Sequence, residues 1–415
     1  MMNWKLFLLE FHKKKIIPSV VCYKNNKNIL VGEYALNNLK QYINSTIFES
    51  KRLIGHLFTD SQIQDDIKNS NVEIIGDKKN KPQYVIKIND KEIDRIYPEE
   101  VSKEILKYFK ENSEKFVESK LKEKVNITKA VITVPYHFNE DKKNIIKNIG
   151  KEVFKDGVEI LKEPIAIGLG YGFIHPCKEE KTVLFFDIGG GSFGISIFKI
   201  KDKQYDILAL GGGGHLGGEN FNNKLIEYVK QKISEDNRFK DIINFENKKD
   251  NRILRILFEI KRKVIKVLSQ LIEDIDAEFI YEGLIENENF ILDITREYYI
   301  NTLCKDLWKK IFDEIEQVFG NEEKIKREDI NEIILVGGSS RTPGIQEKMK
   351  EYFKKEINEI FEVDAFSTTR IKEKKNKEDY KKGMVLQNVN VDEIVAQGAA
   401  IYTFIKNDIT YNIKK

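Results

Sequence analysis

The chain has 415 residues, of which 41% are hydrophobic and 33% are charged, and this length suits two lobes with a core in each. Its 70 lysines and arginines nearly balance its 67 aspartates and glutamates, so the net charge of +3 gives no argument for a nucleic-acid partner. The three cysteines lack disulfide or metal-type spacing, and no apolar run reaches the ~18 residues of a membrane span, so we expect a cytoplasmic protein with no membrane partner.

Hydrophobic patterning predicts alternating short strands and helices over the first 176 residues. A proline followed by two glutamates marks the start of the longest helix, because acids are favoured in a first turn. The predicted helices are 36–43, 98–124 and 140–154. The predicted strands are 16–23, 28–31, 72–75, 84–88, 130–134 and 157–160.

The stretch 181–200, KTVLFFDIGGGSFGISIFKI, contains two apolar runs separated by a glycine turn, and it predicts a β-hairpin. Consecutive glycines leave the backbone N–H groups uncovered, and such a turn forms a concave site for an anion such as phosphate. Asp187 ends the first run, where a carboxylate can hold a divalent cation against that phosphate. The alternative is an ordinary glycine-rich hairpin with a solvated aspartate.

The second part of the chain contains two more glycine-rich turns, each between an apolar strand and a helix. The first follows the strand at 205–210, and the second follows the strand at 332–336. A segment dominated by charge at 370–382 is expected to be a solvated or disordered insertion. The predicted helices are 221–233, 251–271, 295–319, 345–354 and 391–405, and further strands are predicted at 279–282 and 288–294.

The three glycine turns together favour a phosphate site, because helix N-termini also attract phosphate. The sequence contains neither the G-x-x-x-x-G-K-[ST] pattern of a P-loop nor a G-x-G-x-x-G opening a βαβ unit. For any one turn taken alone, the competing interpretation is an ordinary glycine-rich connection between a strand and a helix.

Several motifs, in this order, resemble the seventy-kilodalton heat-shock chaperones over about residues 16–405. They are FESKRLIG at 48–55, ITVPYHF at 132–138, Glu163-Pro164, FDIGGGSF at 186–193, HLGGENF at 215–221, LVGGSSRTP at 335–343, and Asp392-Glu393 followed by Gly398-Ala399-Ala400. The resemblance implies an α/β fold: the two-lobed actin-like ATPase, a duplicated ribonuclease H-like fold, here incomplete at its N-terminus. It further implies lobe I at 1–176, lobe II at 177–388 with the insertion at 370–382, and a C-terminal helix region at 389–415 returning to the interlobe region, with no substrate-binding domain.

The resemblance also implies catalytic roles for three side chains, with ATP or ADP and Mg²⁺ as cofactors. Lys51 matches the lysine that orients the attacking water, and in isolation it is an ordinary surface lysine. Glu163 matches a carboxylate near the metal, and in isolation it is a helix-capping acid. Asp187 matches the acid that binds magnesium through water and helps to activate the nucleophile.

The resemblance assigns nucleotide contacts to the glycine turns and to residues near them. Those in the turns and at the ribose are Gly189, Gly190, Gly191, Ser192, Gly217, Gly218, Glu219, Gly337, Gly338, Ser339, Arg341 and Asp392. Arg341 is expected to stack on the base, and Asp392 to lie beside the ribose. The family also has an adenosine clamp on the helix at 251–271, and its candidates here are Glu259, Arg262, Lys263 and Lys266. Their register is open within about two residues, and a basic solvated helix face is the alternative.

The sequence departs from the family at the phosphates. The family begins with a phosphate loop of the type Asp-x-Gly-Thr-Thr, whereas residues 1–11 contain neither Gly nor Asp. Gly194 and Asn220 stand where the family has aspartates. Losing carboxylates weakens cation binding, and positioned charge supplies most of the catalysis of phosphoryl transfer.

Four hypotheses follow. The first is a chaperone-family protein that binds Mg-ATP in the cleft between the lobes and hydrolyses it slowly to support ATP-dependent protein folding. The second is a non-catalytic pseudo-ATPase that acts as a binding or regulatory module. The third is a fragment of a longer chain, and the fourth is a sugar or acetate kinase of the same fold. J-domain co-chaperones and nucleotide-exchange factors are the implied partners, and direct binding of client peptide is not expected without the second half of the family's chain.

Overall fold

The computed structural model describes residues 16–25, 28–89, 91–174, 178–202, 204–247, 250–320, 325–353, 392–406 and 412–414. The segment 370–382, predicted to be a charged insertion, lies outside the described residues. The same is true of residues 1–11, in which the family's first phosphate loop has no counterpart in sequence.

Two three-stranded antiparallel sheets form the first part of the chain. In sheet order, their strands are β2 (Asn28–Val31), β1 (Val20–Asn25) and β3 (Thr46–Phe48), then β4 (Glu73–Gly76), β5 (Pro82–Ile88) and β6 (Lys91–Ile96). Val21 of β1 and Ile86 of β5 are fully buried in one shared apolar core. The two sheets therefore form one unit.

A parallel pair, β7 (Lys129–Val134) and β8 (Gly157–Lys162), lies beside this unit and is connected by helix α4 (Glu140–Val153). The long helix α3 (Pro98–Leu121) begins at a proline and is capped by Glu100, whose carboxylate accepts the Tyr97 backbone N–H at 2.8 Å. The sequence predicted both helices to within a few residues.

The predicted helix at 36–43 is wrong. Helix α1 spans only Glu33–Asn37, and a 3₁₀ turn follows at Ile43–Ser45. The Asn38 side chain donates to the Tyr34 backbone oxygen at 2.9 Å. Asparagine side chains compete for backbone groups in this way, so they favour helix ends over helix interiors.

The second part of the chain is built on a five-stranded sheet with the order β14-β9-β10-β11-β15. Its strands are β9 (Lys181–Ile188), β10 (Phe193–Lys201), β11 (Gln204–Gly213), β14 (Glu332–Val336) and β15 (Asn412–Lys414). β9 and β10 form the hairpin that the sequence predicted, in antiparallel register. Alternate residues of β9 enter different cores, Val183 on one face and Leu184 on the other, which explains a continuous rather than alternating apolar run.

Helices and a second hairpin complete this half of the molecule. They are α6 (Gly218–Glu235), α7 (Asn251–Gln270), β12 (Asp276–Ile285), β13 (Glu288–Thr295), α8 (Arg296–Tyr298), a π-helical turn (Tyr299–Leu303), α9 (Lys305–Gly320) and α10 (Ile345–Phe353). α9 packs closely on β11, where a Cβ added at Gly211 would lie 2.1 Å from Val318 Cγ2. The sheet, α6, α7 and α9 share the largest apolar core of the described residues.

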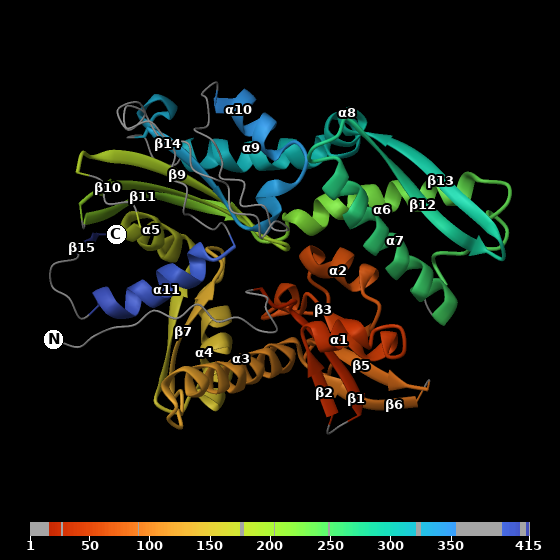
Figure 1. The fold of residues 1–415 in the computed structure, drawn as a ribbon, viewed down its shortest axis with the longest axis horizontal. Coiled ribbons are helices and arrows are strands. Elements are labelled where there is room, and N and C mark those ends of the chain that lie inside the picture. The colour runs from red at the N-terminus through yellow and green to blue at the C-terminus, as the bar shows by residue number, and fades with distance from the viewer. Residues whose placement is uncertain are drawn as a thin grey trace.

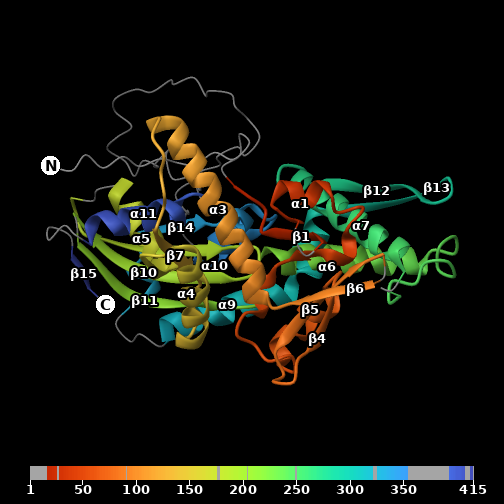
Figure 2. The same cartoon turned by 90° about the horizontal axis from the view of Figure 1, so that it is seen from below.

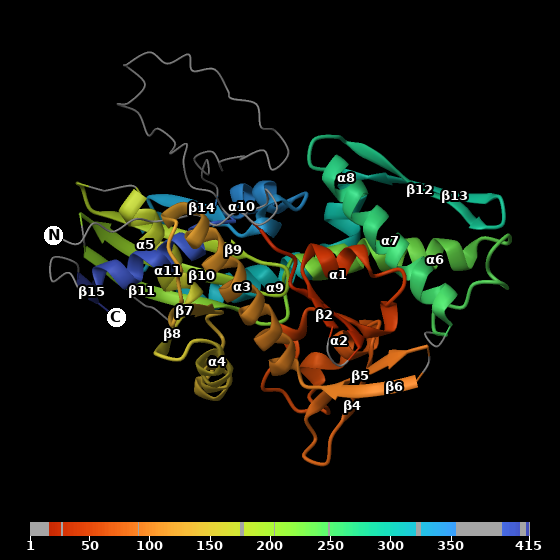
Figure 3. The ribbon, with the colours of Figure 1, turned by 60° about the horizontal axis from the view of Figure 1, so that its bottom comes forward.

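Helices α5 (Glu163–Ile174) and α11 (Ile394–Ile405) pack against each other between the two halves. A Cβ added at Gly398 would lie 1.7 Å from the Ala166 backbone oxygen, so this crossing requires glycine. Figure 1 shows β1 to α4 in the lower half of the view and β9 to α10 in the upper half, with α5 and α11 between them. Figures 2 and 3 show the β12–β13 hairpin at one end of the molecule and β15 at the other.

Among the described residues, no helix combines the length and the apolar character that crossing a membrane requires.

Candidate nucleotide site

The three glycine turns converge on one place, at the ends of the neighbouring parallel strands β9 and β14. The Gly218 N–H donates to the Gly189 backbone oxygen at 2.9 Å, and the Glu219 N–H donates to the Gly190 oxygen at 2.8 Å. A Cβ added at Gly217 would lie 2.5 Å from the Ser192 backbone nitrogen. The first two turns therefore touch through their backbones, and a side chain at this contact would separate them.

The third turn closes the same site from β14. Gly337 has a φ of +83°, which favours glycine, and a Cβ there would lie 2.4 Å from the Ile188 backbone oxygen. The Ser339 Oγ lies 2.0 Å from the position a Cβ would take at Gly218. The sequence predicted a shared role for the three turns, and the structure brings them into direct contact.

Asp187, the penultimate residue of β9, lies at the centre of this site. A Cβ added at Gly337 would lie 2.6 Å from its Oδ1. A Cβ added at Gly194, opposite Asp187 in the hairpin, would come no nearer than 4.0 Å to Asp187 Cβ and Pro164 Cγ. The absence of a side chain at Gly194 thus leaves open space beside the carboxylate.

Lys51 and Glu163, which lie 112 residues apart in sequence, form an ion pair at 2.9 Å beside Asp187. Burial raises the pKa of Asp187 to about 7, the Glu163 carboxylate adds to the rise, and the Lys51 ammonium opposes it. Lys51 comes from the 3₁₀ turn η2 (Ser50–Leu53), and Glu163 is the first residue of α5. The three predicted catalytic side chains therefore meet in one electrostatic cluster.

The carboxylates Asp187 and Glu163 offer the hard oxygen ligands that Mg²⁺ prefers. Among the described residues, no group of three or more His, Cys, Asp or Glu side chains is arranged to hold a metal alone. Mg²⁺ characteristically keeps several waters and binds through one or two carboxylates together with substrate phosphates, so this ligand set fits it.

Arg341 and Asp392, predicted at the base and the ribose, contact each other. Two guanidinium hydrogen bonds at 2.9 and 3.3 Å join Arg341 to the Asp392 carboxylate. A Cβ added at Gly338 would lie 3.1 Å from Asp392 Oδ1. The structure thus places the start of α11 against the third glycine turn.

The candidates for the adenosine clamp lie on α7 but face different neighbours. Glu259 accepts from Arg262 at 2.9 Å, and the Lys263 ammonium lies 5.7 Å from the ring centre of Tyr281 on β12. Lys266 is exposed. Lys261, which the sequence did not single out, pairs at 2.9 Å with Glu219 of the second glycine turn. The clamp register remains a prediction.

Arg52 is a second residue that sequence reasoning missed, although it lies inside the FESKRLIG motif. Its side chain is only 8% exposed and donates to Asp66 Oδ1 at 2.8 Å. The same guanidinium donates to the Gly190 backbone oxygen at 3.2 Å and to Asn220 Oδ1 at 3.3 Å. Arg52 thus ties η2 to both the first glycine turn and the start of α6.

Three histidines from separate segments meet beside the second glycine turn. The rings of His56 and His215 are 5.3 Å apart between their centres, and His215 Nδ1 lies 3.1 Å from Asp66 Oδ2. The His137 ring covers Gly214, where an added Cβ would lie 2.9 Å from its Cδ2.

Lys142 determines the protonation state of the His56 ring and which of its nitrogens carries the proton. Its ammonium, which can only donate, lies 2.6 Å from His56 Nε2, so this nitrogen accepts and the ring is neutral. Nδ1 then carries the proton and donates to Asp60 at 3.0 Å. Burial lowers the pKa of His56, opposed by the hydrogen bond to Asp60.

His137 makes the stability of the fold depend on pH. Burial, followed by repulsion from Lys142 and Lys51, lowers the pKa of His137 to about 4. The unfolded chain, with a histidine pKa of ~6.5, binds the extra proton between these values, so stability falls as pH drops through this range. Because the ring is partly exposed, we expect a loss of about 1–2 kcal/mol.

Urea unfolding near pH 7 and near pH 5 measures this effect. The His137→Gln variant should lose that part of the pH dependence, while other titrating groups contribute equally to both proteins. The same change in unfolding free energy in the variant and the parent chain would contradict the assignment to His137.

The two-part α/β architecture, with glycine turns meeting around a partly buried aspartate, defines a nucleotide-binding domain of the actin-like ATPase class. A family model described as "Hsp70 protein" matches residues 8–369, and the chain belongs to this family. It is 31% identical over 389 residues to a "Heat shock 70 kDa protein" of Emericella nidulans, an alignment covering 94% of this chain and 53% of that protein. It is 30% identical over 388 residues to "Heat shock 70 kDa protein 2" of Paracoccidioides lutzii, covering 94% and 52% respectively. The chain thus spans about half the length of the curated relatives it matches.

Proposed function

We propose that this chain binds Mg-ATP between its two halves and hydrolyses it slowly, to support ATP-dependent protein folding. The observation that carries the proposal is the convergence of three glycine turns on the cluster of Asp187, Glu163 and Lys51. Gly189–Ser192 would hold phosphates through backbone N–H groups, and the other two turns would hold the rest of the nucleotide. Family membership supports the same assignment.

Each member of the catalytic cluster has a chemical task in this proposal. Lys51 orients the attacking water and is itself positioned by Glu163. Asp187 would accept the proton that the water loses. Asp187 and Glu163 would hold the Mg²⁺, which neutralises charge on the phosphates when it is bound.

At the nucleoside end, Arg341 stacks on the base and Asp392 contacts the ribose, while α7 supplies the adenosine clamp. The proposed lobes are residues 1–176 and 177–388, with α11 between them, whereas β15 pairs with β11 at the edge of the large sheet. J-domain co-chaperones and nucleotide-exchange factors are the proposed partners, and the proposed location is the cytoplasm.

Slow hydrolysis follows from the loss of two carboxylates. Gly194 and Asn220 replace aspartates of the family beside the phosphates. Asn220 accepts a hydrogen bond from Arg52 but adds no charge to offset the guanidinium. Each ~1.4 kcal/mol of lost transition-state stabilisation slows the reaction tenfold.

A single-turnover assay separates slow hydrolysis from the pseudo-ATPase alternative. The chain is mixed with a substoichiometric amount of radiolabelled ATP and Mg²⁺, and bound ATP, bound ADP and free phosphate are followed over hours. We expect bound ATP to convert fully to ADP and phosphate. Stable retention of bound ATP would support the pseudo-ATPase, and failure to retain any nucleotide would contradict both functions.

A further inference from the structure

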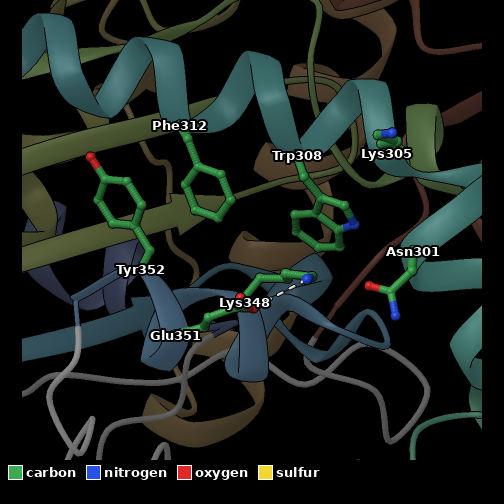
Figure 4. A pocket seen from close by; sticks show the side chains of 7 residues that line it. All are labelled: Asn301, Lys305, Trp308, Phe312, Lys348, Glu351 and Tyr352. Atoms are coloured by element: carbon green, nitrogen blue, oxygen red, sulfur yellow. Dashed lines mark hydrogen bonds and ion pairs between the residues drawn. The ribbon is translucent and has the colours of Figure 1, made fainter.

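A cavity outside the candidate nucleotide site lies between α9 and α10 (Figure 4). Its volume is about 400 Å³, within the range of small-molecule sites. Its lining side chains come from α9, α10 and the π-helical turn, and they are Asn301, Lys305, Trp308, Phe312, Lys348, Glu351 and Tyr352. None of them belongs to the three glycine turns or to the catalytic cluster.

The aromatic walls of this cavity are held in place by contacts with one another and with neighbouring groups. Trp308 Nε1 donates to the Ile300 backbone oxygen at 2.8 Å, which fixes the indole ring. Tyr352 stacks on Phe312 with ring centres 4.6 Å apart and planes within 5° of parallel. Arg327 lies 4.6 Å from the centre of the Tyr352 ring. The rings are therefore preorganised, which reduces the entropy lost when a ligand binds.

The mouth of the cavity carries more positive than negative charge. Lys348 pairs with Glu351 at 3.1 Å, as the dashed line in Figure 4 shows. Lys305 lies at the end of the row of aromatic side chains opposite Tyr352 and is exposed, and it forms no ion pair with any described residue. Two ammonium groups and one carboxylate thus surround an aromatic slot, and one cation is left without a counter-ion among the described residues.

We propose that this cavity binds a small aromatic anion, a flat ring bearing one carboxylate. The ring would lie against Trp308 and Phe312, where aromatic pairs gain energy beyond their buried area. The carboxylate would accept hydrogen bonds from the Lys305 ammonium, which forms stronger bonds to a charged acceptor than to a neutral one. The proposal is independent of nucleotide binding, because it uses none of the same residues.

The probe for this site is 3-phenylpropanoate, compared with its neutral amide and with hexanoate, an anion without a ring. The sequence contains two tryptophans, so in a Trp4→Phe background the fluorescence of Trp308 reports on the cavity alone. We expect saturable quenching with a Kd of about 0.1–1 mM for 3-phenylpropanoate. Binding of the amide and of hexanoate should be at least about fivefold weaker.

Two further substitutions and a matched control test the charges. Lys305→Gln should weaken binding of the acid about fivefold and leave that of the amide unchanged. Glu351→Gln frees Lys348 and should tighten binding of the acid, a gain that misfolding cannot produce. Lys309→Gln, an exposed lysine of α9 outside the cavity, should have no effect.

The absence of a saturable fluorescence change up to about 5 mM of 3-phenylpropanoate would overturn the proposal. Equal affinities for the acid and the amide would overturn it as well. So would an equal loss of affinity for the acid in the Lys305→Gln and Lys309→Gln variants.

Discussion

The Asp187→Asn variant should hydrolyse bound ATP about 10²–10³-fold more slowly than the parent chain. Asparagine has nearly the same shape but neither accepts the proton of the attacking water nor brings a negative charge to the cation. A single-turnover assay with radiolabelled ATP measures this loss directly.

The same substitution should stabilise the ligand-free chain above neutral pH. Asp187 has a folded pKa of about 7, against ~3.9 in an unfolded chain, so the folded state binds more protons between these values and stability falls as pH rises. Above pH 7 the folded chain carries the cost of a desolvated carboxylate, and Asn removes it. We expect a gain of about 1–3 kcal/mol in the free energy of unfolding near pH 8.

Asp241→Asn is the matched control, because Asp241 is an exposed aspartate of the same half of the chain. Neither its turnover rate nor its stability should differ from the parent by more than the error of measurement. If Asp187→Asn kept the parent rate, the catalytic role of Asp187 would be abandoned. If it instead lost stability at pH 8, the carboxylate would be a structural group.

Arg52→Ala should destabilise the fold far more than the loss of an exposed arginine, by about 2–4 kcal/mol in the free energy of unfolding. Arg52 is 8% exposed, and its removal leaves the largely buried Asp66 with His215 alone. Burial raises the pKa of Asp66, but hydrogen bonds from His215 and Arg52 outweigh it and hold the value below its usual range. Without Arg52, the low pKa of Asp66 therefore no longer contributes as much to the stability of the folded chain at neutral pH.

Arg95→Ala provides the comparison for the same chemical change at the surface. Arg95 and Glu92 form an ion pair at 2.7 Å, but their side chains are 51% and 44% exposed. Such pairs contribute about 0–1 kcal/mol. In urea unfolding, Arg52→Ala should therefore lose clearly more unfolding free energy than Arg95→Ala. Equal losses in the two variants would show that Arg52 does not tie the glycine turn to η2.

Much of the fold could be predicted from the sequence where the hydrophobic pattern is long or where glycine or proline marks its boundaries. The hairpin of β9 and β10 is marked by two apolar runs and three glycines, and α3 by a proline at its start and its length of 24 residues. The short segment at 36–43 does not form the predicted helix, because the Asn38 side chain competes for a backbone hydrogen bond. Over so few residues, periodicity alone does not show where a helix ends.

Some residues of the candidate site could be predicted from the sequence and others could not, because only some of them carry a local signal. The glycine turns and Asp187 carry a local signal, since their residue types are required by the backbone and by the cation. The roles of Arg52 and Lys261 depend on partners that only folding brings near: Arg52 reaches Asn220, which is 168 residues away. Lys261 is one of several basic residues on α7, and its pairing with Glu219 distinguishes it only in the folded chain.

Isothermal titration of the full chain with ATP, with and without Mg²⁺, tests the central claim most directly. The account predicts one saturable site per chain, with affinity that falls when Mg²⁺ is withdrawn, because Asp187 and Glu163 then face the phosphates without a neutralising cation. Titration with no saturable heat in either condition would contradict the claim that the three glycine turns form a nucleotide site.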